Sequence, residues 1–298
     1  MSTGVHVVIA GASGLIGSAL VASLRRDGHD AVVLVRRPAA HRNESEWAPD
    51  RGEVDAAALA NADAVVCLSG AGVADKRWTT EYKQTLTRSR LDPVATLATA
   101  LAAGAGPGVL VSASAVGYYG DTGDAIVDET APRGAGFLAE LCEKWEAAAG
   151  PAREAGVRVA HLRTGLVLTA DGGLLKRLKP IALMGMAGRL GTGRQYMPWI
   201  SMSDEVAAIR HVIDSDLAGP INLTGPAPVT NAEFMAALGR AVHRPTVVPT
   251  PAFALRLALG EFASDTLTGQ RAIPAQLAGS GFEHQHRDID AALAWALA

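Results

Sequence analysis

Three glycines near the N-terminus have the spacing needed to hold a dinucleotide. Gly11, Gly14 and Gly17 form a Gly-x-x-Gly-x-x-Gly pattern directly after the apolar run 5–10 and before a helical pattern. The first glycine permits a sharp turn, and the second lets the backbone approach a pyrophosphate because it has no Cβ. The third lets the helix pack close to the strand. The other members of this predicted phosphate-binding turn are Ser13, Leu15 and Ile16.

The position of the glycines supports this prediction more than their number does. Three glycines often mark only a turn, and the pattern alone is weak evidence of a ligand. Here a buried strand precedes it and a helix follows it, so the N–H groups and the positive end of the helix dipole would face the phosphates. We therefore expect dinucleotide binding at the start of the chain.

Two arginines after the second predicted strand, residues 31–35, indicate which dinucleotide binds. Arg36 and Arg37 lie where an NAD site carries an Asp or Glu that accepts hydrogen bonds from the ribose 2′-hydroxyl. An arginine at this place accommodates a 2′-phosphate instead. The sequence therefore predicts NADP as the cofactor, unless the two arginines only begin a solvated loop.

Two further strands end in small or polar residues that would lie at the same edge. Strand 64–68 ends at Leu68 and is followed by Ser69 and Gly70, and we expect these three residues to pass close to the cofactor. Strand 108–114 ends at Ser114. In open α/β sheets, ligands bind outside the carboxyl ends of the strands. These residues and the glycine turn are therefore expected to meet at one site.

The strand and helix patterns alternate at least five times, which is typical of a parallel sheet covered by helices on both faces. The sequence predicts an α/β protein, a Rossmann-type doubly wound parallel sheet with a smaller C-terminal substrate lobe. We place the NADP-binding domain at residues 1–170 and the mainly helical lobe at residues 171–298, with 202–224 expected to return to the first domain. Residues 39–53 are expected to be irregular, and residues 137–150 to form one helix.

The composition of the chain limits the kinds of molecule that we expect it to bind. The chain has 298 residues, of which 49% are hydrophobic and 19% charged, with a net charge of −3. A globular protein without a basic stripe is not expected to bind nucleic acid. No apolar run is long enough for a membrane span and no signal peptide is visible, so the cytoplasm is the expected compartment. The two cysteines and eight histidines show no metal-ligand spacing. We expect a small-molecule substrate and no metal.

Several motifs together resemble the extended short-chain dehydrogenase/reductase superfamily, and within it an NAD(P)-binding, epimerase-like subfamily of unassigned substrate. The resemblance covers nearly the whole chain. It implies the Rossmann fold, a nicotinamide cofactor and a C-terminal domain of the subfamily's own. The motifs that carry it are the glycine turn, Leu68-Ser69-Gly70, the strand ending at Ser114, 117–121 (GYYGD), 144–148 (KWEAA), 162–165 (LRTG), 198–200 (PWI) and the block 244–282.

The resemblance also implies a catalytic arrangement that this chain lacks in part. In the superfamily a Tyr and a Lys four residues apart on one helix transfer a proton, and a strand serine holds the substrate oxygen. Helix 137–150 contains no tyrosine. Alignment on its Glu146 places Leu138 and Cys142 at the two positions, and a shift of two residues places Glu140 and Lys144 there.

Two residues remain as catalytic candidates. Ser114 has the right place for the serine role, although a serine at a strand end can also bond its own backbone. Tyr119 lies just after the serine strand and could act on the substrate oxygen, although packing or lining the substrate site is the alternative. Scattered cations could form an anion-binding wall with two tryptophans as stacking surfaces. The members considered for it are Lys76, Arg77, Trp78, Arg163, Arg189, Arg194 and Trp199.

Two functions follow from these observations. The first is an NADP(H)-dependent oxidoreductase or epimerase-like enzyme that transfers a hydride to or from a small carbonyl, hydroxyl or nucleotide-linked compound. The second is a non-catalytic NADP-binding redox sensor or scaffold, which the missing Tyr–Lys pair favours. The sequence leaves both open, because a fold does not determine a function.

Overall fold

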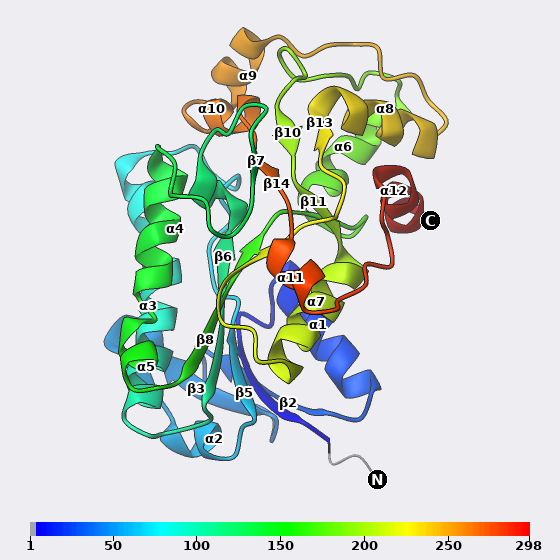
Figure 1. The fold of residues 1–298 in the computed structure, drawn as a ribbon. Coiled ribbons are helices and arrows are strands. Elements are labelled where there is room, and N and C mark those ends of the chain that lie inside the picture. The colour runs from blue at the N-terminus through cyan, green and yellow to red at the C-terminus, as the bar shows by residue number, and fades with distance from the viewer. Residues whose placement is uncertain (1–3) are drawn as a thin grey trace.

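An eight-stranded, mainly parallel sheet forms the centre of the computed structural model, which describes residues 4–298 (Figure 1). The strand order is β12-β8-β6-β5-β1-β2-β3-β4, and only the β3–β4 pair is antiparallel. This is the α/β Rossmann-type fold that the sequence predicts. The strands are β1 (His6–Ala10), β2 (Asp30–Val35), β3 (Glu44–Ala48), β4 (Glu53–Val54), β5 (Ala64–Cys67), β6 (Val109–Ala115), β8 (Arg158–Thr164) and β12 (Gly219–Leu223).

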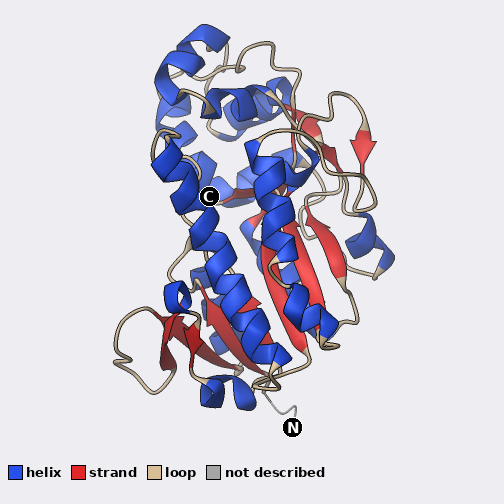
Figure 2. Ribbon diagram, turned by 90° about the vertical axis from the view of Figure 1, so that its left-hand side faces the viewer, coloured by secondary structure: helices blue, strands red, loops and turns tan. Residues whose placement is uncertain are grey.

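Both faces of the sheet are buried, as the continuous apolar strands require. Val7 and Ile9 of β1 pack on one side with α1 (Leu15–Arg26) and α7 (Met202–Asp214). Val8 faces the other side, which α3 (Thr80–Ala102), α4 (Phe137–Ala147) and α5 (Gly150–Glu154) cover. Figure 2 looks onto this second helical layer, with the sheet behind it. The short α2 (Ala56–Ala60) lies between β4 and β5 in the chain.

A smaller, mainly helical lobe lies above the carboxyl end of the sheet (Figure 1). Its core contains Leu175, Trp199, Phe234 and Leu293, all almost fully buried. After the first part of the lobe, the chain returns to the main sheet. α7 packs against α1, and β12 then joins the sheet beside β8. The helices of the lobe are α6 (Gly173–Leu183), α8 (Asn231–Ala241), α9 (Ala252–Leu259), α10 (Phe262–Leu267), α11 (Ala275–Gly279) and α12 (Ile289–Leu297).

Three pairs of short strands lie outside the eight-stranded sheet. They are β9 (Leu166–Leu168) with β11 (Trp199–Ser201), β10 (Tyr196–Met197) with β13 (Val229–Thr230), and β7 (Ile126–Val127) with β14 (Arg271–Ala272). The 3-10 turns are η1 (Pro49–Arg51) and η2 (Val116–Tyr119).

Two local predictions are wrong in part. Residues 39–43 are irregular, but residues 44–54 form β3, η1 and β4, because Trp47 is buried and anchors β3 between β2 and β4. The helix expected at 137–150 ends at Ala147, and Pro151 in the first turn of α5 begins a new helix. In the lobe, α9 and α10 are separate helices, because Gly260 lies between them with a φ of +63°.

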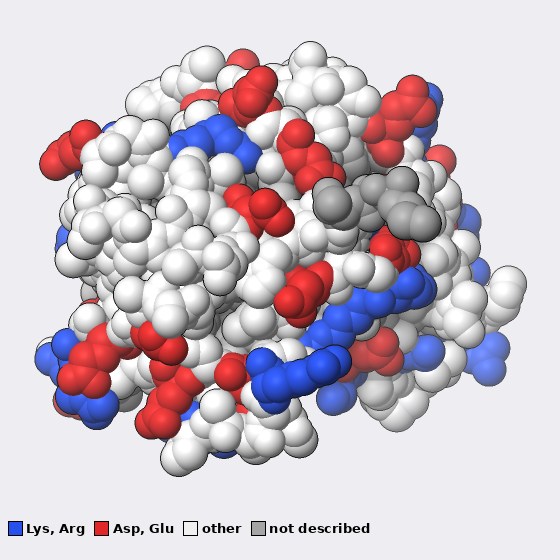
Figure 3. Space-filling model, turned by 90° about the horizontal axis from the view of Figure 1, so that it is seen from below, with Lys and Arg blue, Asp and Glu red and all other residues white. Residues whose placement is uncertain are grey.

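The surface seen from below mixes acidic and basic side chains with large uncharged areas (Figure 3). Among residues 4–298, no helix has both the length and the apolarity needed to cross a bilayer. The same residues contain no group of three or more His, Cys, Asp or Glu side chains that could hold a metal ion.

Candidate functional site

The glycine turn between β1 and α1 is tightly packed on two sides and open on the third. Gly11 has a φ of +82°, and a Cβ there would come within 2.6 Å of the Leu68 carbonyl carbon. A Cβ on Gly17 would overlap the carbonyl oxygen of Gly11, so the third glycine allows the helix to pack on the turn itself. A Cβ on Gly14 would meet only that same carbonyl oxygen, at 3.2 Å. Gly14 and Ser13 are exposed, which leaves their side of the turn free for a ligand.

The N-terminus of α1 is suited to a phosphate. Gly14 is the N-cap residue and provides no side chain to bond the N–H groups of the first turn. The first turn therefore presents unpaired donors and the positive end of the helix dipole. Leu15 and Ile16, the first two helical residues, are half-buried. The backbone here can hold a pyrophosphate, as a dinucleotide cofactor requires.

The loop after β5 is fixed beside the glycine turn by helix α3. Leu68 N–H donates to the Ala10 carbonyl at 2.9 Å, which carries the strand pairing up to the turn. Beyond Ser69 and Gly70, the Ala71 N–H donates to Ser89 Oγ at 3.0 Å, and Arg90 Nη2 donates to the Ala71 carbonyl at 3.0 Å. The loop therefore has a defined position at the carboxyl edge, where a cofactor would pass.

The structure separates the roles of the two arginines after β2. Arg37 forms a bidentate ion pair with Glu44, with N–O distances of 2.7 and 2.8 Å. Hydrogen bonds from Arg37 and from the Ala40 N–H lower the pKa of Glu44 to about 2. Arg37 therefore orders the loop after β2. Arg36 is exposed and has no ion pair among the described residues, so its guanidinium is available to a 2′-phosphate.

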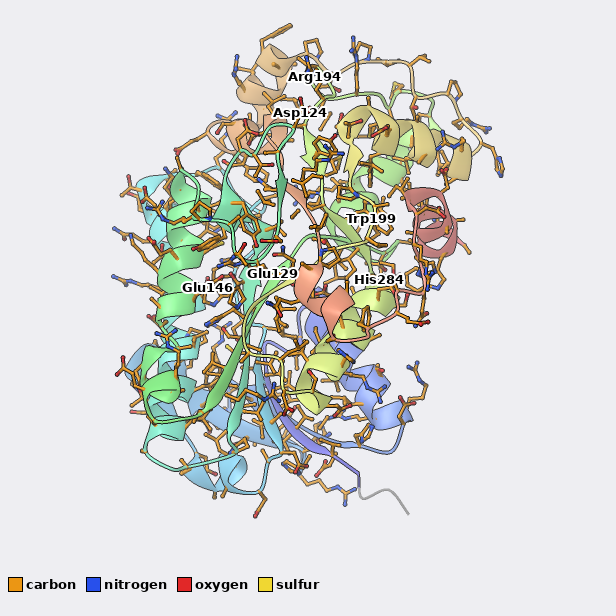
Figure 4. The ribbon with its side chains drawn as sticks, viewed as in Figure 1. Asp124, Glu129, Glu146, Arg194, Trp199 and His284 are labelled. Atoms are coloured by element: carbon orange, nitrogen blue, oxygen red, sulfur yellow. The ribbon has the colours of Figure 1, made fainter. Side chains whose placement is uncertain are left out.

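Ser114 lies at the carboxyl end of β6 but donates its hydroxyl proton inside the protein. Ser114 Oγ donates to Glu146 Oε1 at 2.7 Å. The same carboxylate accepts two bonds from Arg163, at 2.8 Å from Nε and 2.9 Å from Nη2. The Arg163 side chain is 3% exposed and that of Glu146 13%, so this is a nearly buried ion pair. Figure 4 labels Glu146 on α4.

Tyr119 belongs to the same network. Its hydroxyl accepts a hydrogen bond from Arg163 Nη1 at 3.0 Å and donates to Asn222 Oδ1 at 2.7 Å. Burial raises the pKa of the phenol, while Arg163 acts in the opposite direction. A role in proton transfer would require the bond to Asn222 to break. The catalytic roles of Ser114 and Tyr119 therefore stay predictions.

The positions of the missing Tyr–Lys pair hold groups that cannot replace it. Leu138 has no titratable group and packs with Trp78 and Phe137. Cys142 is 3% exposed, and burial raises the pKa of its thiol to about 11. Glu140 and Lys144 are both exposed on α4. Proton transfer at this helix would therefore need another group.

Most of the expected anion-binding wall has a structural role instead. Arg163 is committed to Glu146, and Arg77 donates to the backbone carbonyls at the end of α9. Trp78 is buried against Phe137 and Phe262, and Trp199 is 1% exposed in the lobe core. Arg194 remains exposed, 3.8 Å from Asp124 (Figure 4).

Comparison with known proteins agrees with this geometry. Residues 7–223 match the NAD dependent epimerase/dehydratase family. The chain belongs to this family. Residues 250–296, which include α9 to α12 in the lobe, match a domain of unknown function, DUF1731. The predicted superfamily and its separate C-terminal domain are thereby confirmed.

Similar proteins cover nearly the whole chain. It is 52% identical over 292 residues to the epimerase family protein Mb2239 of Mycobacterium bovis, with 97% of each chain covered. The human epimerase family protein SDR39U1, solved with NADPH, superposes with a TM-score of 0.89 at 30% identity and covers 98% of both chains. A nucleoside-diphosphate sugar epimerase of Corynebacterium glutamicum has a TM-score of 0.80 at 34% identity, covering 99% of this chain and 58% of that one.

These similarities and the glycine turn support binding of a nicotinamide dinucleotide. Sequence reasoning missed the residues that hold the site in place. Asn222 and Glu129 connect Tyr119 to the sheet edge, because the Asn222 N–H donates to Glu129 Oε1 at 2.9 Å. Asn222 is 103 residues from Tyr119, and no local pattern links the two. The motif 162–165 did contain a signal, since an arginine within an apolar buried strand requires a buried partner.

Proposed function

We propose that this protein binds NADP(H) and acts as an oxidoreductase or epimerase-like enzyme on a small carbonyl, hydroxyl or nucleotide-linked compound. The observation that carries the proposal is the arrangement at the carboxyl edge of the sheet. The glycine turn packs against Leu68 at the end of β5, and the N-terminus of α1 is uncapped beside them. The human relative with a TM-score of 0.89 was solved with NADPH, which supports the same ligand here.

A bound nicotinamide would supply hydride chemistry at this edge. The residues of this chain would hold it as follows. The N–H groups at the start of α1 bind the pyrophosphate, and Gly14 leaves room for it. Arg36 binds the 2′-phosphate, while Arg37 and Glu44 hold the loop in shape. Ser114 lies at the end of β6, the strand next to β5, where a substrate oxygen could be bound.

The preference for NADP depends on Arg36. A hydrogen bond to a charged group contributes about 1.5–3 kcal/mol, which corresponds to about 10- to 150-fold in affinity. Arg36→Ser is therefore expected to weaken NADPH binding by that factor and to leave NADH binding unchanged, measured by fluorescence titration of the nucleotide. An equal loss for both nucleotides, or no loss for NADPH, would show that Arg36 does not contact the 2′-phosphate.

The substrate is expected to be a small molecule with an anionic group. Arg194 and Arg271 both contact Asp124. Arg194 lies 3.8 Å from the Asp124 carboxylate, and Arg271 donates to the backbone carbonyl of Asp124 at 3.2 Å. The Arg271 guanidinium also lies 4.8 Å from the ring centre of Tyr196. Arg194 thus pairs with the Asp124 carboxylate, whereas Arg271 meets only the backbone carbonyl of Asp124 and lies within electrostatic range of the Glu233 carboxylate. The support for a phosphate or carboxylate on the substrate is therefore Arg194, which is exposed and lies 3.8 Å from its only carboxylate among the described residues.

A second function is favoured by one observation. The catalytic pair's positions hold Leu138 and Cys142 or, in the shifted alignment, Glu140 and Lys144. The hydroxyl protons of Ser114 and Tyr119 are donated to Glu146 and Asn222. A protein with this arrangement could bind NADP without turnover, as a redox sensor or scaffold. Mass spectrometry of the purified protein distinguishes the two. A co-purified carbonyl compound or sugar nucleotide supports the enzyme, whereas a dinucleotide alone supports the sensor.

A further inference from the structure

A cavity of about 440 Å³ lies away from the dinucleotide site, beside α5 and the edge of the sheet. Its walls come from the end of α4, from α5, from β8 and from the start of β12. No residue of the glycine turn, of the loop after β5 or of the loop after β2 lines it. Its volume lies within the range of small-molecule sites, about 300–1,000 Å³.

Positive charge exceeds negative charge in this cavity. Three arginines line it, namely Arg153, Arg158 and Arg163, against the single carboxylate of Glu146. Glu146 pairs with Arg163. Within residues 4–298, neither Arg153 nor Arg158 has a carboxylate within ion-pairing distance. The charge of Arg153 therefore remains unpaired at the cavity, whereas Asp216 and the carbonyls at the end of α7 offset the charge of Arg158. Positive charge in a hollow with low-dielectric walls concentrates anions.

Arg158 is held in place before any ligand arrives. Its Nη1 donates to the carbonyls of Val212 and Leu217, at 3.0 and 2.7 Å, and its Nη2 donates to that of Ile213 at 2.9 Å. These bonds fix the guanidinium at the end of α7. Because successive side chains of a strand alternate between faces, Arg158 points to the α7 face with Ala160 and Leu162, whereas Val159 faces α4 and α5. Arg153 is exposed on α5 and is free to turn toward the cavity.

His161 is a buried polar group in the same wall with no assigned role. It is 4% exposed, and burial lowers the pKa of its imidazole to about 4, so it is neutral at pH 7. Its Nδ1 has no hydrogen-bond partner among the described residues. The tautomer of a histidine is set by the partner of its other nitrogen. The ring can therefore adopt the tautomer that donates to an anion.

The remaining wall is apolar and is made by Ala147, Val157, Val159 and Pro220. We propose that this cavity is a second ligand site, which binds a compact organic anion: a phosphate or carboxylate head held by Arg153 and by the Nδ1–H of His161, with an apolar body against the β8 wall. Its floor is the Glu146–Arg163 ion pair that also holds Ser114 and Tyr119. The cavity therefore borders the candidate catalytic residues without including them.

Calorimetric titration with phenyl phosphate tests the proposal. The titration is done with saturating NADPH, so that the phosphate-binding turn cannot bind the probe. Arg153→Gln removes one cation, and Ala218→Phe fills the mouth, where Ala218 is exposed. Both are surface changes, and equal melting temperatures confirm that the fold is intact. Arg42→Gln is the matched control, because Arg42 is an exposed arginine in the loop between β2 and β3.

We expect saturable binding of phenyl phosphate that both variants weaken at least 10-fold and Arg42→Gln leaves unchanged. Inorganic phosphate should bind more weakly because it lacks the apolar body, and neutral benzyl alcohol should not bind. The proposal is overturned by an absence of saturable binding up to about 10 mM, by binding that survives both variants, or by equal binding of inorganic phosphate. A protein that does not bind NADPH can be titrated alone with the same variants, so failure of the proposed function leaves this test intact.

Discussion

Glu146→Gln is the substitution that the structure predicts to be most damaging near the candidate site. The carboxylate accepts three hydrogen bonds, from Ser114 Oγ and from Nε and Nη2 of Arg163. The amide would keep one acceptor oxygen, but its NH₂ group would face an Arg163 donor. Arg163, 3% exposed, would then carry a buried charge without a counter-ion. Removing one partner of a buried pair costs about 3–5 kcal/mol.

Urea denaturation, followed by far-UV circular dichroism, measures this cost. Glu143→Gln on the same helix is the matched control, because Glu143 forms an exposed ion pair with Arg133 at 3.0 Å. Such pairs contribute about 0.2–1 kcal/mol. The double variant Glu146→Leu with Arg163→Met removes both charges and should be less destabilised than Glu146→Gln. If Glu146→Gln costs no more than Glu143→Gln, or if the double variant is the less stable one, the reasoning on the buried pair is refuted.

Three further predictions concern other buried groups. Burial raises the pKa of Glu205 to about 8 from an unfolded value near 4.5, so the folded state binds the proton more tightly. The stability that this proton contributes is complete below pH 4.5. It is lost as the pH rises toward 8, at up to about 1.4 kcal/mol per pH unit. Glu205→Gln should remove that part of the pH dependence in thermal melts between pH 5 and 8, and an unchanged profile would contradict the assignment. Asp204 accepts hydrogen bonds from the backbone N–H groups of Gln285 and His286 at 2.7 and 3.1 Å. Asp204→Ala should therefore lower the free energy of unfolding by about 2–4 kcal/mol and increase hydrogen exchange in the segment after α11. Unchanged exchange in that segment would show that this contact is not needed to hold it. Ser114→Ala should leave NADPH affinity within about 2-fold and reduce any turnover found with a co-purified substrate; full turnover would exclude Ser114 from the chemistry.

The fold was predictable because its signals are local. The run 5–10 and the glycine spacing predict β1, the turn and α1, and the structure has all three in that order. The error at residues 39–53 has a physical reason. β3 is the second strand from the edge and has mixed polarity, and its position depends on the burial of Trp47 and on pairing with β2, which no local pattern encodes.

The site was predictable only in its backbone part. Glycines act through their own conformation, so Gly11 and Gly17 could be interpreted from sequence alone. The roles of side chains depend on long-range partners. Arg36 and Arg37 are adjacent and of the same type, yet only Arg37 meets Glu44. Arg163 was expected on a substrate-facing wall, but Glu146, on another element, holds it inside the protein.

The most direct measurement is calorimetric titration of the purified protein with NADPH and with NADH, with Gly14→Val as the control. We predict that NADPH binds at least 10-fold more tightly than NADH and that Gly14→Val abolishes binding of both, because its side chain would occupy the space of the pyrophosphate. Absence of binding by the unmodified protein would contradict the assignment of the glycine turn. Undiminished binding by Gly14→Val would do the same, and equal affinity for the two nucleotides would contradict the role of Arg36.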